Sequence, residues 1–68
     1  MNNSLAKEAL SNLIYGAMCF MPVGTEIYVP YFEINKVRNY MDQFERRDHK
    51  IFKADLLNTD YYSIVRIT

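Results

Sequence analysis

The sequence predicts a small α+β domain with the element order α-β-α-β-β and a three-stranded antiparallel sheet. Apolar residues recur every three or four positions up to residue 21 and again over residues 32–48, which is helical periodicity. The period changes to two from about Ile51 onward, as it does in strands. With 68 residues, half of them hydrophobic, we expect residues 1–68 to form a single domain.

The first helix is predicted from about Asn3 to Met21. Gly16 lies inside this helix, where glycine costs about 1 kcal/mol, so we expect another backbone to approach it closely. The apolar stripe is broad enough for complete burial in the monomer or for a homodimer contact through this helix. The stripe comprises Leu5, Ala6, Ala9, Leu10, Leu13, Ile14, Ala17, Met18 and Met21.

Three segments are predicted as strands. The first comes after a predicted type I turn at residues 21–24, which has proline at its second position and glycine at its fourth. Residues 25–29 alternate as a strand that Pro30 ends. Residues 51–57 and 61–68 are two further strands, and the Asn-Thr-Asp sequence between them is typical of a turn. We therefore expect these last two strands to form a hairpin.

The second helix is predicted from about Phe32 to Asp48. Its buried seam is spaced by three, four and three residues and comprises Ile34, Val37, Met41 and Phe44. The complete order of elements is similar to that of winged helix-turn-helix domains, in which the short strand pairs with the hairpin. One helix is missing here, so the resemblance is to an abbreviated winged helix. A βαββ unit with an added helix is the nearest alternative.

Composition argues against several function classes. Eight basic residues balance eight acidic residues, so net charge does not indicate nucleic-acid binding. The longest strongly apolar stretch, residues 13–23, is shorter than the roughly 20 residues of a membrane span. The first eight residues lack the pattern of a signal peptide. We expect an intracellular, cytoplasmic protein that does not contact membranes.

Chemistry-bearing residue types are scarce in this sequence. Cys19 and His49 are the single cysteine and the single histidine, whereas a zinc site needs four ligands. The two glycines, Gly16 and Gly24, do not form a phosphate-binding loop. Paired carboxylates such as Asp42 and Glu45 are expected on a solvated helix face. We expect no catalytic residue, no metal and no cofactor.

The outer side of the second helix is the leading candidate for a binding surface. Residues 34–54 carry six cations against three anions, although the whole chain is neutral. Asparagine and glutamine can contact adenine in the major groove, arginine can contact guanine, and lysines at the start of the hairpin wing could contact phosphates. The predicted DNA-contacting residues are Lys36, Arg38, Asn39, Gln43, Arg46, Arg47, Lys50 and Lys53.

Two other interpretations remain open for these surfaces. The charges near the ends of the second helix are also those that the helix macrodipole favours, so the face can be a solvated one. Six aromatic residues exceed what so small a core can bury easily: Tyr28, Tyr31, Phe32, Tyr40, Tyr61 and Tyr62. Tyrosine is enriched at protein interfaces because it combines a large area with a polar tip. The alternative is therefore a protein-binding inhibitor or adaptor, with an interface at Tyr28, Tyr31, Tyr40 and Tyr62.

Short motifs over residues 29–67 resemble those of a set of small phage-encoded proteins, mostly without assigned activity. The matching pieces are Val29-Pro30, Val37-Arg38, Lys50-Ile51-Phe52 and Val65-Arg66-Ile67-Thr68. Residues 54–57 replace a more basic strand of that pattern, and the tryptophan often found before the final arginine is lacking. The resemblance implies a phage accessory protein in the host cytoplasm. Such a protein either regulates DNA or blocks a host enzyme or defence complex, as anti-CRISPR proteins do.

Overall fold

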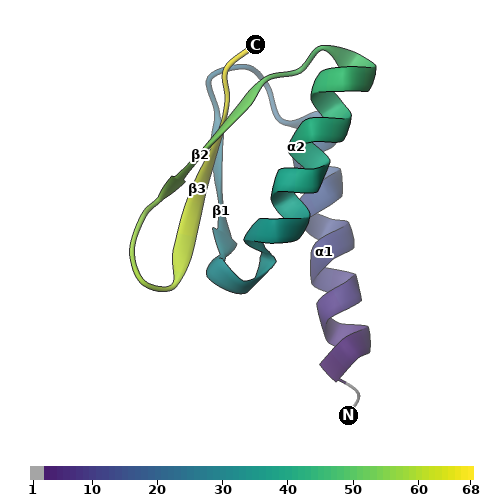
Figure 1. Cartoon of the computed structure of the whole chain (residues 1–68), viewed down its shortest axis with the longest axis vertical. Coiled ribbons are helices and arrows are strands. Elements are labelled where there is room, and N and C mark those ends of the chain that lie inside the picture. The colour runs from purple at the N-terminus through teal and green to yellow at the C-terminus, as the bar shows by residue number, and fades with distance from the viewer. Residues whose placement is uncertain (1–2) are drawn as a thin grey trace.

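The computed structural model describes the backbone of residues 3–68 and the side chains of residues 9–68 (Figure 1). The elements are α1 (Asn3–Phe20), β1 (Glu26–Pro30), the 3-10 turn η1 (Tyr31–Glu33), α2 (Ile34–Asp48), β2 (Phe52–Leu56) and β3 (Tyr61–Arg66). The predicted α+β class and the order α-β-α-β-β are confirmed. Most predicted boundaries lie within one or two residues of these bounds.

The three strands form one antiparallel sheet in the order β1-β3-β2. Ile64 in the central strand lies opposite Ile27 on one side and Ala54 on the other. The short first strand therefore pairs with the hairpin, which is the pairing expected from the winged-helix pattern. Both helices lie side by side on one face of the sheet (Figure 1). We call this the inner face; none of the described elements covers the other, outer face.

The core lies where the two helices meet the inner face of the sheet. The fully or nearly buried apolar residues are Ile14, Met18, Met21, Val29, Val37, Phe44, Phe52 and Ile64. Phe44 has no exposed surface, and its ring centroid lies 5.0 Å from that of Tyr15 on α1 and 5.6 Å from that of Phe52 on β2. The predicted seam of α2 is confirmed, since its other members are buried or half-buried.

The broad stripe of α1 is divided between the core and the surface. Ile14 and Met18 are buried, whereas Leu13 is 71% exposed and Phe20 is 85% exposed. Complete burial in the monomer is thus contradicted, because α2 and the sheet cover one side of α1 and the stripe extends beyond that side. The space around Gly16 is open, with no described atom of another element within 4 Å of the place a Cβ would take, so the expected close approach of a second backbone is wrong. The side chains of the predicted stripe members Leu5 and Ala6 lie outside the described residues.

The turn between α1 and β1 lies one residue later than predicted. The Thr25 backbone N–H donates to the carbonyl of Pro22 over 3.2 Å, so the turn spans residues 22–25. Gly24 is its third residue and has a φ of 85°. This position requires positive φ in a type II turn, and glycine adopts it without steric cost. The positive φ of Gly24 therefore decides where the turn lies along the chain.

We expect Phe44→Ala to lower the free energy of unfolding by about 3–5 kcal/mol, because it removes a fully buried ring and leaves a cavity. Phe32→Ala is the matched control, since Phe32 is 53% exposed. Its effect should stay within about 0.5–1 kcal/mol. Urea unfolding followed by circular dichroism measures both. Equal losses for the two variants would contradict the assignment of Phe44 to the core.

Candidate functional site

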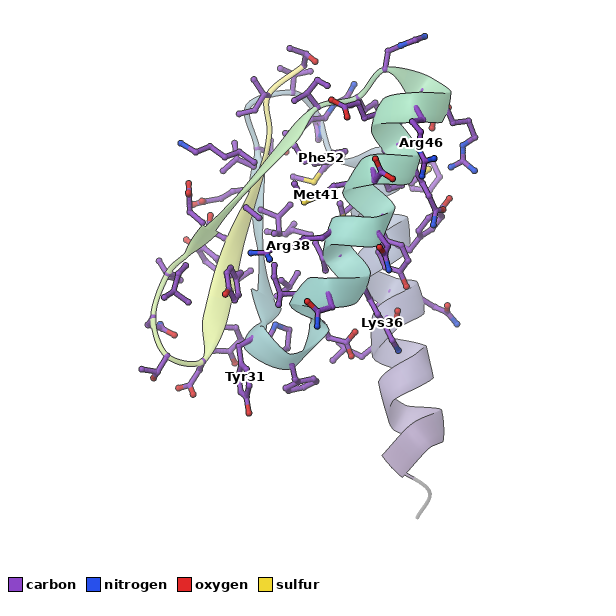
Figure 2. The ribbon with its side chains drawn as sticks, in the orientation of Figure 1. Tyr31, Lys36, Arg38, Met41, Arg46 and Phe52 are labelled. Carbon is purple, nitrogen blue, oxygen red and sulfur yellow. The ribbon has the colours of Figure 1, made fainter. Side chains whose placement is uncertain are left out.

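The solvent side of α2 carries six of the eight predicted DNA-contacting residues. These six are exposed: Lys36, Arg38, Asn39, Gln43, Arg46 and Arg47. They do not all point the same way. Figure 2 shows Arg38 reaching toward the sheet and Arg46 pointing away from it. The guanidinium carbon of Arg38 lies 6.0 Å from the centroid of the Tyr62 ring.

Arg46 and Arg47 both have partners within the chain. Arg46 forms an ion pair with Asp42 one turn earlier. Nη2 of Arg47 donates to the Tyr15 hydroxyl over 2.7 Å, and its Nε lies 3.6 Å from Oδ2 of Asp48. The hydrogen bond to Tyr15 is the largest cause of a raised pKa of Arg47, followed by the charges nearby. These contacts reduce the positive potential that α2 presents to solvent, since opposite charges lie close to both arginines.

Lys50 and Lys53 do not lie on the same surface as the six α2 residues. Lys50 follows α2 and its Nζ donates to the carbonyl of Cys19 over 3.0 Å, at the C-terminal end of α1, where a cation is favourable. Lys53 neighbours the inward-facing Phe52 in β2, so its side chain is on the outer face of the sheet. There its Nζ lies 3.6 Å from Oδ2 of Asp55. The eight residues therefore form no single DNA-facing surface.

The four tyrosines predicted as a protein interface are also divided. Tyr28 and Tyr31 are exposed. Tyr40 is half-buried, shares a hydrogen bond with Ser11, and its ring meets Tyr15 edge-on at 5.1 Å. Tyr62 is half-buried beneath Arg38. Tyr40 and Tyr62 thus help to hold the elements together, while Tyr28 and Tyr31 are left for contacts with other molecules.

A second exposed surface lies where η1 meets the loop of the hairpin. We call it the aromatic end and define it as Tyr28, Tyr31, Phe32, Leu57 and Tyr61, each of which is roughly half exposed. The Tyr31 N–H donates to the carbonyl of Asp60 over 2.8 Å, which joins η1 to the hairpin loop. The rings of Tyr31 and Phe32 meet edge-on at 5.7 Å. Figure 2 shows Tyr31 pointing outward from this end of the molecule.

Sequence reasoning missed Leu57, whereas Phe32 and Tyr61 were among the six aromatic residues expected to exceed what the core can bury. A signal for Leu57 was present, because two adjacent leucines in a strand cannot both face inward. The direction of the Phe32 side chain could not be predicted, because Phe32 lies in a short turn between a strand and a helix, and the direction of that turn depends on packing.

A hydrogen-bonded group on the outer face of the sheet anchors Tyr28. Oε2 of Glu26 accepts from Ser63 Oγ over 2.7 Å, and Oε1 accepts from the Tyr28 hydroxyl over 3.0 Å. The bond from Ser63, followed by that from Tyr28, lowers the pKa of Glu26. The bond to Glu26 raises the pKa of Tyr28. Tyr28 is therefore held in one orientation at the edge of the aromatic end.

Glu33 is a buried carboxylate at the beginning of α2. It is 2% exposed, and its Oε2 has no hydrogen-bond partner among the described residues. Burying such a group without a partner costs free energy, which the positive end of the α2 dipole partly offsets. Within the described part of the chain, no cluster of three or more His, Cys, Asp or Glu side chains could hold a metal ion.

We expect the carboxyl pKa of Glu26 to rise in a Ser63→Ala variant, because the variant loses the largest cause of the lowered value. A lowered pKa in the folded state adds stability above the ordinary glutamate pKa of about 4.3, and this stability is lost as pH falls through the folded pKa. The wild type should therefore lose more stability than Ser63→Ala between pH 7 and acid. Carboxyl NMR titrations measure the pKa, and equal midpoints in the two proteins would refute the assignment.

No helix in the described residues is both long enough and apolar enough to cross a bilayer. Comparison of the chain with protein-family models, with curated proteins and with solved structures finds no match. A function is therefore inferred from two surfaces of the described residues, the solvent side of α2 and the aromatic end.

Proposed function

We propose that this chain is a non-catalytic accessory protein that binds another protein through the aromatic end. The observation that carries the proposal is the gathering of Tyr31, Phe32 and Tyr61 where η1 meets the hairpin. Aromatic side chains are enriched at protein interfaces and supply most of the energetic anchors. An aromatic group of this size at one end of a small domain is typical of a contact surface.

The backbone beneath the aromatic end is well fixed. Oδ1 of Asn58 accepts from the N–H of Asp60 over 2.8 Å and from that of Tyr61 over 3.0 Å, which closes the hairpin loop. The Leu57 N–H donates to the carbonyl of Tyr61 over 3.0 Å. A surface that is already ordered loses less conformational entropy on binding. This favours a preformed contact surface over a flexible loop.

Charges around the aromatic end indicate the chemistry of the partner. Glu26 lies on the outer face of the sheet beside Tyr28, and Asp60 lies in the hairpin loop, so acidic groups border the aromatic side chains. A basic rim on the partner would steer association and stabilise the complex. This chemistry fits the inhibitor or adaptor class that the phage resemblance implies, acting on a host enzyme or defence complex.

DNA binding through α2 is the second candidate. It is favoured by the exposed Arg38, Asn39 and Gln43, which lie on the solvent side of a helix of suitable size for the major groove. The hairpin that would act as a wing supports it less, because the hairpin loop carries Asp60 and Lys53 pairs with Asp55. Phosphates would be repelled by these carboxylates.

Two variants of the chain separate the two candidates. The aromatic variant combines Tyr31→Ser, Phe32→Ser and Tyr61→Ser, and the arginine variant combines Arg46→Ala with Arg47→Ala. We expect the wild type and the arginine variant to capture the same protein from a bacterial host lysate. The aromatic variant should bind that protein, once purified, at least about tenfold more weakly, a change equivalent to about 1.4 kcal/mol. Circular dichroism establishes that both variants fold.

The same three proteins are then titrated with mixed-sequence duplex DNA at low and moderate salt. The protein-binding proposal predicts no measurable DNA affinity for any of them. Wild-type DNA binding that falls steeply with salt, with a slope reduced by about two contacts in the arginine variant, would place DNA binding first. Equal protein capture by the aromatic variant and the wild type would also overturn the proposal.

A further inference from the structure

We propose that β2 pairs antiparallel with β2 of a second copy of this chain. The two Ala54 residues lie opposite each other, and the two-fold axis passes between them. The two three-stranded sheets would then form one continuous sheet. This inference concerns a surface outside the aromatic end and does not depend on the partner proposed for that end.

The edge of β2 has main-chain groups that point away from the sheet. β2 is an edge strand, because β3 lies between it and β1. The carbonyl of Ile51 accepts from the Ile67 N–H over 2.7 Å, and the Leu57 N–H donates to the carbonyl of Tyr61 over 3.0 Å. Hydrogen bonds between two antiparallel strands join every second residue, so the N–H and C=O groups of residues 51, 53, 55 and 57 point toward β3. Phe52, Ala54 and Leu56 therefore direct their N–H and C=O groups outward.

The sequence Phe-Lys-Ala-Asp-Leu of β2 is complementary to itself when it is reversed. With Ala54 on the axis, Lys53 lies opposite Asp55 of the partner subunit, and Asp55 lies opposite the partner's Lys53. These are the non-hydrogen-bonded pairs, in which side chains approach most closely, with Cα atoms about 4.5 Å apart. Lys53 and Asp55 already lie 3.6 Å apart within one chain, so four charges of alternating sign would share the outer face.

Charge also excludes the neighbouring registers. Outward-directed residues must pair with outward-directed residues, so the axis can move from Ala54 only to Lys53 or Asp55 without losing most of β2. An axis at Lys53 would place two lysines opposite each other, and an axis at Asp55 would place two aspartates opposite each other. Like charges directly opposite each other destabilise a strand pair. Opposite charges therefore select a single register.

The inner face of the same pair is apolar. Leu56 is 65% exposed in the single chain, although it lies on the inner face of β2. A hollow of about 210 Å³ between α2 and β2 is lined by Met41, Ile51 and Phe52, with Asp42 and Glu45 also lining it. Figure 2 shows Met41 and Phe52 in this region. The proposed register places Leu56 of the partner subunit opposite Phe52, at this hollow, and thus covers an exposed leucine.

The other edge of the sheet is less suited to pairing. β1 ends in Pro30, which has no N–H to donate, and its outward-facing Glu26 is engaged with Ser63 and Tyr28. Charged side chains commonly protect an edge strand from pairing. In β2 the two charges are of opposite sign and symmetrically placed, so they oppose most registers and favour one.

The test uses charge reversal on the full chain and measures its association by sedimentation equilibrium. Lys53→Asp and Asp55→Lys should each weaken dimerisation at least tenfold, because each places like charges opposite each other. The double variant with both changes should dimerise like the wild type. An equimolar mixture of the two single variants should form a heterodimer. Both side chains are exposed, so circular dichroism should show an unchanged fold.

A control variant with Leu13→Asn and Phe20→Asn addresses α1, whose exposed side chains are the other candidate for a homodimer contact. This control should dimerise like the wild type. The inference would be overturned if the wild type stayed monomeric at about 1 mM, since a specific strand pair should have a dissociation constant below this concentration. Failure of the double variant to restore association, or loss of the dimer in the α1 control, would overturn it as well.

Discussion

The burial of Phe44 between both helices and the sheet is the interaction on which the rest of the structure depends. Its ring meets Tyr15 of α1 and Phe52 of β2, and the cationic groups of Arg47 and Lys50 lie 5.8 and 5.7 Å from its centroid. The same two cations bond to Tyr15 and to the last turn of α1. Because one side chain joins three elements, its position decides which face of α2 remains in solvent.

Most charged side chains on that solvent face have partners within the chain. Several apolar side chains at the end and edge of the sheet, in contrast, are exposed. On the solvent face of α2, Arg46 and Arg47 have partners on α1 or α2, and on the outer face of the sheet Lys53 pairs with Asp55. Exposed rings at the aromatic end and the exposed Leu56 have no comparable cover. Burial of apolar surface is the main favourable term in protein association. The balance of these surfaces therefore favours contacts with proteins over contacts with phosphates.

Residue periodicity was sufficient to predict which side of α2 and of β2 faces the core. The seam through Val37 and Phe44 and the alternation in β2 follow directly from it. Periodicity does not say what covers a face, so the exposure of Leu13 and the direction of Lys50 could not be predicted. Both depend on how α1 lies against α2. The outward direction of Lys53 could have been predicted from its neighbour Phe52, and grouping it with the α2 residues overlooked this alternation.

If Phe44 joins the elements as described, α1, α2 and the sheet unfold as one cooperative unit. Native-state amide hydrogen exchange measures this most directly, because it gives an opening free energy for each residue. We predict equal opening free energies for the amides of Met18 in α1, Phe44 in α2 and Ile64 in β3, all of which have fully buried side chains. An opening free energy for Met18 that is several kcal/mol below that of Ile64 would contradict this, since α1 would then detach while the sheet stays folded.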